Sequence, residues 1–197
     1  MRRRSELLHE GLLSDSPPTQ ALRDTARTLK TRAVYYLSKR EHSRAELTKK
    51  LSQPTYKARQ NAFVHRTELP EPPSVEDITG VLDDLQKQGF LSDERFAHSL
   101  AHKHANKHGA ARVIASLGQH QLDSHTTQAL ATQLKSTELS RCYAVWARKF
   151  DPINRDALSY LEVQAAMGKQ GRFLMQRGFN SDAVKKVIQG WTPSEVS

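Results

Sequence analysis

The sequence predicts an all-α protein, built as three tandem three-helix repeats that form an elongated, curved molecule. Apolar residues recur at spacings of three and four along most of the chain, with no strand-like alternation of useful length. The same helix ending occurs twice, at Gly89 and at Gly178. Hydrophobic residues make up only 37% of 197 residues, which favours several thin helical layers over one thick core. Because a three-helix unit cannot bury both its faces alone, we expect neighbouring repeats to stack.

The clearest element is a helix over 74–88 with a defined start and end. Ser74, followed by Asp77 three residues later, predicts a capping box. Gly89 fits the left-handed position after the helix, and Phe90 would pack on Leu85 in a Schellman ending. The apolar stripe of this helix comprises Val75, Ile78, Val81, Leu82 and Leu85.

The first repeat begins with a helix from Ala21 to about Lys39. Ser43 then caps a short helix, RAELTKKL, in which Glu46 completes a capping box. Residues 52–73 contain four prolines and few apolar residues, so they predict a long surface loop. The helix over 74–88 completes the repeat.

The second repeat begins at Ser92, which caps a helix over 93–107. A short helix, AARVIASL, follows Gly109, and Asp123 or Ser124 begins a third helix that extends to about Leu134.

The third repeat begins with a helix over 138–150. Leu158 and Leu161 suggest further helix within 153–165, a short helix covers 169–177, and Asn180 or Ser181 caps the last one.

The short helices align as RAELTKKL, AARVIASL and QGRFLMQR, which makes Glu46, Arg112 and Arg172 equivalent. This alignment predicts the repeat boundaries. The segments are a disordered N-terminal tail at 1–20, the repeats at 21–90, 91–136 and 137–191, and a C-terminal tail at 192–197.

The chain carries a net charge of +9, which favours polyanions or acidic protein surfaces as partners over a merely basic soluble protein. Its single cysteine, Cys142, excludes an internal disulfide and a CxxC zinc site and is compatible with a reducing cytoplasm. The sequence has no run of 18 apolar residues, so no membrane span is predicted. The N-terminus lacks the apolar region of a secretory signal.

No catalytic motif occurs, so we expect a non-enzymatic protein without cofactor or metal. Four histidines share one predicted helix, but their spacing places them in two pairs on different faces. Asp83 and Asp84 are adjacent and do not face each other. Cys142 and the aromatic residues are expected in the core; the aromatic set is Phe90, Phe96, Trp146, Phe150 and Phe173.

Five segments in order resemble the bacterial RecX regulatory proteins: YLSKREHSRAEL, VLDDLQKQGFLSDERFAHSL, KHGAARVIASL, WARKF and RFLMQRGF. The resemblance covers about Ala26 to Trp191 and implies the same three-repeat helical fold. It also implies a protein that binds the RecA nucleoprotein filament along its groove, damps its ATPase, strand-exchange and co-protease activities, and has affinity for DNA. The long loop, the first twenty residues and His120-Gln121-Leu122 depart from the family pattern.

If the repeats share one curvature, their basic residues would line a concave strip that meets the partner; the alternative is a scattered, solvated surface. We expect the protein to be a monomer. A second possible function is a non-enzymatic helical DNA-binding protein acting through phosphate contacts. Its helix-turn-helix version is disfavoured because Asp93 and Glu94 would repel phosphates. The candidate residues are Arg32, Lys39, Arg40, Arg44, Lys49, Lys50, Lys103, Lys107, Arg112, Arg148, Lys149, Lys169, Arg172 and Arg177.

Overall fold

The computed structural model describes residues 20–193, with side chains from Ala26 onward, and this part of the chain is helical without a strand. The predicted N-terminal tail up to Thr19 and the last four residues lie outside it. The helices are α1 (Gln20–Leu37), α2 (Arg44–Leu51), α3 (Tyr56–His65), α4 (Val75–Lys87), α5 (Asp93–Ala105), α6 (Ala110–Leu117), η1 (Gly118–His120), α7 (Ser124–Ser136), α8 (Glu138–Ala147), α9 (Tyr160–Gln176) and α10 (Ser181–Ile188).

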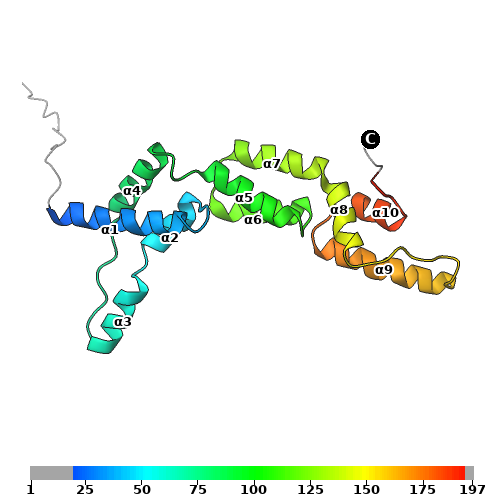
Figure 1. Ribbon diagram of the computed structural model, residues 1–197, viewed down its shortest axis with the longest axis horizontal. Helices are drawn as coiled ribbons and strands as arrows, with labels where there is room; N and C mark the ends of the chain where they lie inside the picture. Colours follow the sequence, from blue (N-terminus) through cyan, green and yellow to red (C-terminus); the bar gives the residue numbers. More distant parts are fainter. Residues whose placement is uncertain (1–19, 194–197) are drawn as a thin grey trace, which may run out of the picture.

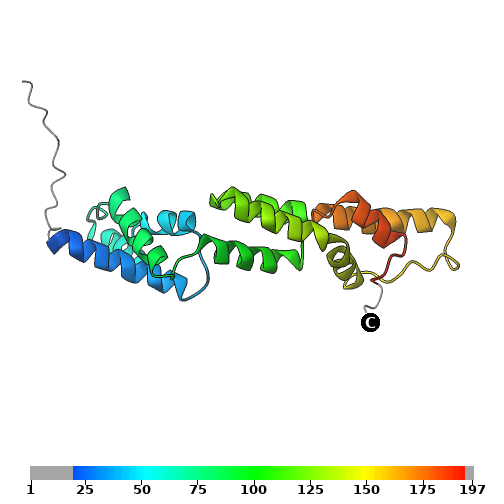
Figure 2. The same cartoon turned by 90° about the horizontal axis from the view of Figure 1, so that it is seen from above.

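The helices form an elongated arch, with α1 at one end and α9 and α10 at the other (Figures 1 and 2). This shape, together with its helical repeats, confirms the predicted fold class. Within residues 20–193, no helix is both long and apolar enough to cross a membrane.

Three separate hydrophobic clusters follow one another along the arch. The first joins α1, α2 and α4 around Leu47 and Leu82. The second joins α5, α6 and α7 around Val113, and the third joins α8, α9 and α10 around Cys142 and Leu174. We propose that the repeat boundaries follow these clusters and fall near 90/91 and 136/137.

The predicted N-caps form at each helix start that the sequence marked. The side chains of Ser43, Ser74, Ser92, Asp123 and Asn180 each accept a hydrogen bond from the backbone N–H three residues later. Only this half of the predicted capping box forms at Ser43 and at Ser74. At Ser43 the carboxylate of Glu46 binds His42 instead. A complete capping box occurs where none was predicted, between a serine and a glutamate at the start of α9.

Both predicted glycine endings are Schellman motifs. At Gly89 (φ 76°), the N–H of Phe90 donates to the carbonyl of Leu85 at 2.9 Å, and the turn at Gly178 has the same bonds. The predicted burial of Phe90 is wrong, since its side chain is 56% exposed. Leu91 is buried in its place and donates its own N–H to the same carbonyl, so the ring is not needed to cover the helix end.

Two segments differ from the sequence prediction. The predicted loop 52–73 contains α3, which Thr55 caps and which buries no residue. The predicted continuation of helix at 153–165 is wrong over its first half, because α9 begins only at Tyr160, and Leu161 is exposed. The expected short helix over 169–177 is the second half of this long helix.

Candidate partner-binding surface

The second helix of each repeat lies on the inner side of the arch. In Figure 1, α2, α6 and α9 lie on its lower side, whereas α4 and α7 lie on the upper side. Several predicted contact residues come from these inner helices: Lys49 and Lys50 from α2, Arg112 from α6, and Lys169 and Arg172 from α9. The fold therefore places the three helices that align in the sequence on the same side of the arch (Figure 1).

Two candidate arginines of the first repeat hold its helices together. Arg32 donates to the carbonyls of Lys50 and Gln53 at 3.0 and 2.9 Å, so it caps the C-terminal end of α2. Arg44 pairs with Asp83 of α4 at 2.7 Å. Their guanidinium groups already bind other residues of the same chain, which leaves few donors for an external partner.

The other candidate cations of the first repeat differ in whether their charged groups contact other side chains. Arg40 pairs with Glu46 at 3.0 Å. The ammonium groups of Lys39 and Lys50 lie 5.3 and 4.8 Å from tyrosine ring centres, at distances typical of cation–π contacts. Lys49 is exposed, and its ammonium group makes no hydrogen bond, ion pair or ring contact with any residue of the described chain.

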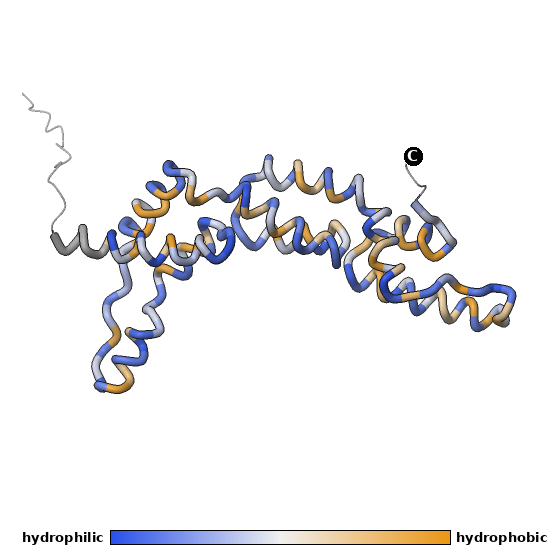
Figure 3. The backbone as a smooth tube through the Cα atoms, in the orientation of Figure 1, coloured by the Kyte–Doolittle hydropathy of each residue, from blue (hydrophilic) through white to orange (hydrophobic). Residues whose placement is uncertain are grey.

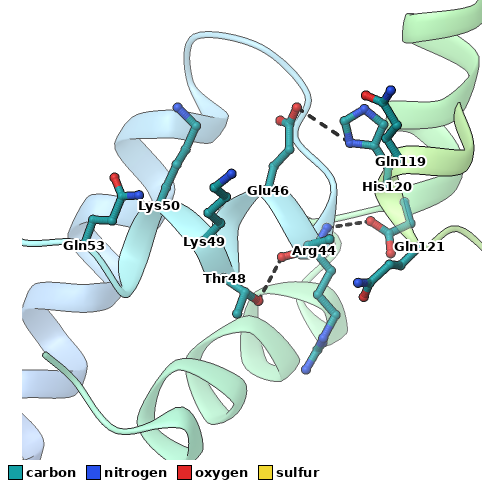
Figure 4. Close-up of a pocket in the computed structure, with 11 residues that line it drawn as sticks. Arg44, Glu46, Thr48, Lys49, Lys50, Gln53, Gln119, His120 and Gln121 are labelled. Carbon is teal, nitrogen blue, oxygen red and sulfur yellow. Dashed lines mark hydrogen bonds and ion pairs between the residues drawn. The ribbon is translucent and has the colours of Figure 1, made fainter. Parts of the chain in front are cut away.

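A groove of about 800 Å³ separates α2 from η1, and the first residue of α5 also lines it (Figure 4). Cationic and amide side chains line it together with two carboxylates that are already engaged. The backbone N–H of Arg44 donates to Asp93 at 2.7 Å, and Glu46 lies 3.8 Å from His120. The lining comprises Arg44, Ala45, Glu46, Thr48, Lys49, Lys50, Gln53, Asp93, Gln119, His120 and Gln121.

Sequence reasoning missed this groove because its two walls come from different repeats. His120-Gln121-Leu122 was the one signal available, as a departure from the family pattern. Free ammonium and amide groups in an open groove can bind carboxylates, backbone carbonyls or phosphates of a partner.

A buried histidine forms a hydrogen bond with one of the residues that line the groove. His42 is 3% exposed and donates from Nδ1 to Glu46 at 2.7 Å. Burial lowers the pKa of His42, more than the bond to Glu46 raises it. Burial alone would raise the pKa of Glu46, but the hydrogen bond from His42 and the charge of Arg40 outweigh it and lower that pKa. The joint between the first two repeats thus contains a neutral imidazole on an ionised carboxylate near pH 7.

The joint between the second and third repeats contains arginines that bind a helix end. Arg141 donates to the carbonyls of residues 105 and 108 at 3.1 and 2.8 Å. Arg148 donates to the carbonyl of Asn106 at 3.2 Å, and Arg177 donates to the carbonyl of Lys107 at 3.3 Å. Four successive carbonyls at the end of α5 are therefore satisfied by cations, which the helix dipole also favours.

Glu138 also connects the second and third repeats at this joint. Its buried carboxylate accepts from the backbone N–H of Ala110 at 3.0 Å and from Nδ2 of Asn180 at 2.5 Å, so it binds the first turn of α6 and the cap of α10 at once. Arg112 donates across the same joint to the carbonyl of Gln176 at 3.0 Å. The sequence predicted Asn180 as a helix cap but gave no structural role to Glu138 or Arg112.

The remaining candidates divide into those that stack on an aromatic ring and those whose side chains are free. Lys149 and Arg177 stack on the ring of Phe173, at 4.7 and 4.4 Å from its centre. Five candidates are exposed, and their side chains make no hydrogen bond, ion pair or ring contact within the described chain. They are Lys49, Lys103, Lys107, Lys169 and Arg172.

Sequence and fold comparisons agree on a family. The family described as RecX, third three-helix domain, matches residues 136–188. Regulatory protein RecX of Ralstonia nicotianae is 36% identical over 163 residues, covering 83% of this chain and 87% of that protein. Regulatory protein RecX of Leptothrix cholodnii is 37% identical over 162 residues, covering 82% and 88%.

Solved structures show the same fold at lower identity. The crystal structure of RecX from Lactobacillus salivarius superposes with a TM-score of 0.58 at 17% identity, covering 85% of this chain and 96% of that one. The predicted resemblance is confirmed by the sequence matches and by this fold. The chain belongs to the RecX family of regulatory proteins.

Proposed function

We propose that this protein is a non-enzymatic regulator of the RecA recombinase. It binds the RecA nucleoprotein filament and mainly inhibits its ATPase, strand-exchange and co-protease activities in recombination, DNA repair and the SOS response. The observation that carries the proposal is the similarity to regulatory RecX proteins along four-fifths of the chain. We also propose that it acts as a monomer in the cytoplasm.

The arch is suited to a long, repetitive partner. Each repeat has its own core, so the molecule stays thin and presents one helix per repeat along its inner side (Figure 1). Repeat proteins of this kind offer extended concave binding surfaces. A surface of this length can touch neighbouring subunits of a filament and restrain the movements that accompany ATP hydrolysis.

The charge distribution supports an acidic or polyanionic partner. Lys49 in the first repeat, Lys103 and Lys107 in the second, and Lys169 and Arg172 in the third are exposed and unpaired within the described chain. Such charges raise the association rate, whereas apolar contacts prolong the complex.

The same charges support a second function, binding to DNA alone through phosphates. The net charge of +9 is the specific observation in its favour. In that case log K would fall with log salt concentration by about 0.9 for each phosphate contact on duplex DNA. Binding through protein contacts would be less sensitive to salt.

Co-sedimentation with RecA filaments on single-stranded DNA distinguishes the two functions. We expect the protein to pellet with filaments to a saturating ratio at salt concentrations that release it from naked DNA. Retention by naked DNA, with no further binding when RecA covers that DNA, would contradict the filament proposal and support the second function.

A further inference from the structure

Helix α3 projects from the body of the molecule as an arm. In Figure 1 it extends below α2, on the same side of the arch as the inner helices. Tyr56 is 77% and Phe63 is 84% exposed, and no residue of the helix is buried. A helix without a buried face gains little from packing in the free protein, so its exposed apolar side chains require another explanation.

The large side chains of α3 share one face. Tyr56 and Phe63 are seven residues apart, which places them two turns apart on one side of a helix, at about 10 Å along its axis. Val64 is also exposed and lies about 100° around the helix from Phe63. The half-buried positions, Ala58 and Ala62, carry small side chains on the opposite face. Figure 3 shows the resulting apolar segment at the outer end of the arm.

The arm carries only positive charge. Lys57, Arg59 and Arg66 are exposed, and residues 52–67 contain no carboxylate. None of these three cations forms an ion pair within the described chain. In the body of the same repeat, by contrast, Lys30 and Arg44 are paired with aspartates of α4.

The arm also begins where the groove beside α2 ends. Lys50 and Gln53 line that groove, and Thr55, two residues later, caps α3. A partner that occupies the groove would therefore lie next to the arm.

We infer that α3 is a docking helix that inserts its Tyr56–Phe63 face into an apolar groove on the protein subunits of the partner filament, with acidic side chains at the rim of that groove. Helices that dock in this way present anchors at spacings of three, four and seven residues. The cations Lys57 and Arg59 flank the aromatic face and would meet the acidic rim.

A protein groove explains this face better than a nucleic acid does. Aromatic rings and cations also bind single strands, by stacking and by phosphate contact. Val64 lies beside Phe63 on the helix and Leu69 lies beyond its end, both exposed, and aliphatic side chains contribute neither to stacking nor to phosphate binding. They do contribute to filling an apolar cleft.

The inference rests on the proposed function, since the partner is the RecA filament. The test measures the affinity of the full-length protein for RecA filaments on single-stranded DNA by co-sedimentation. The variant Tyr56→Ala/Phe63→Ala is compared with wild type and with Phe90→Ala, which removes an exposed ring from the turn between α4 and α5. Circular dichroism confirms that each variant is folded.

We expect the double variant to bind filaments at least tenfold more weakly, since buried aromatic anchors carry much of the energy of an interface. Phe90→Ala should bind like wild type. Equal affinities of wild type and double variant would overturn the docking helix and leave the filament proposal intact. A wild-type protein that fails to bind filaments would overturn both.

Two further measurements on the same proteins exclude the other occupants. An equal loss of affinity for free single-stranded DNA would show that the arm binds nucleic acid and would overturn the inference. A wild-type dimer in sedimentation velocity, converted to a monomer by the double variant, would assign the arm to a second copy of this chain and would also overturn it.

Discussion

Gly109 and Gly178 meet backbone against backbone where the second and third repeats join. A Cβ atom at Gly109 would overlap the carbonyl group of Gly178, and the N–H of Gly109 donates to the carbonyl of Arg177 at 2.9 Å. The approach leaves no room for a side chain, so glycine is required here for space. The joint is therefore fixed by main-chain contact, with the arginines and Glu138 around it.

Replacing Gly109 by alanine should loosen this joint. The added methyl group forces the backbones apart, and overpacking of this kind costs about 1–3 kcal/mol. The free energy of unfolding from urea denaturation measures the effect. Gly80→Ala is the matched control, because a Cβ there meets nothing within 4 Å and alanine favours a helix interior by up to about 1 kcal/mol. Equal stability of the two variants would refute the close approach.

Acidification should destabilise the protein in two stages, beginning at His42. Burial is the main cause that lowers the folded pKa of His42 below 6.5, and the positive charge of Arg40 lowers it further. The hydrogen bond to Glu46 raises this pKa but does not outweigh them. The unfolded chain therefore binds more protons, and stability that is full above pH 6.5 falls as the pH drops through the lower folded pKa. The lowered pKa of Glu46 adds a second loss below about pH 4.5.

Urea unfolding between pH 8 and pH 4 measures this dependence. His42→Asn should remove the part of the first stage that comes from His42, whereas His98→Gln, at an exposed position, should retain it. The pKa of His108 is also lowered, by burial and by the charge of Arg112, so a smaller dependence of the same sign should remain in the His42 variant. A wild-type stability that is flat between pH 7 and pH 5 would contradict the buried neutral imidazole.

Cys142 should be unreactive in the folded protein. The side chain is 0% exposed. Burial, and to a lesser extent the negative charge of Glu138, raises the pKa of its thiol to about 12. Since only the thiolate is nucleophilic, alkylation at pH 8 requires opening of the third repeat. We expect native protein to react with iodoacetamide at least a hundredfold more slowly than urea-unfolded protein, on the order of what burial and thiolate depletion together predict. Equal rates would place the thiol at the surface.

Reversing charge on the inner side of the arch should weaken binding to the filament. Lys49→Glu/Lys169→Glu changes two unpaired, exposed cations and disturbs no contact within the described chain. Interfacial charges of this kind act mainly on the association rate, so we expect about a tenfold loss at low salt that narrows as salt is added. Lys135→Glu on α7 is the control on the upper side (Figure 1). An equal loss in this control would indicate nonspecific attraction.

Most helix boundaries could be predicted because they depend on local chemistry. Ser43, Asp123 and Asn180 cap helices by bonds within one turn, and Gly89 ends a helix by its own conformation. Helix α3 could not be found in this way, because it buries no face and has only two aromatic residues at helical spacing rather than a continuous apolar stripe. Phe90 was misplaced because the next residue in the chain covers the helix end.

The candidate site was predictable only in part, and the reason lies in the chemistry of arginine and lysine. Arg32, Arg148 and Arg177 were candidates for a partner, but each donates to backbone carbonyls of another element. A planar guanidinium with several donors suits such positions, whereas a lysine ammonium stays hydrated at the surface. Which helix ends would need these donors depends on packing between repeats, which spacing along the chain does not reveal.

The most direct test of the central claim is the ATPase rate of RecA filaments on single-stranded DNA, titrated with this protein. The account predicts a saturable fall in the rate at or below one molecule per RecA subunit, and no fall with a control protein of similar size and charge. An unchanged rate at excess protein would contradict filament regulation and leave the fold as all that the chain shares with its family.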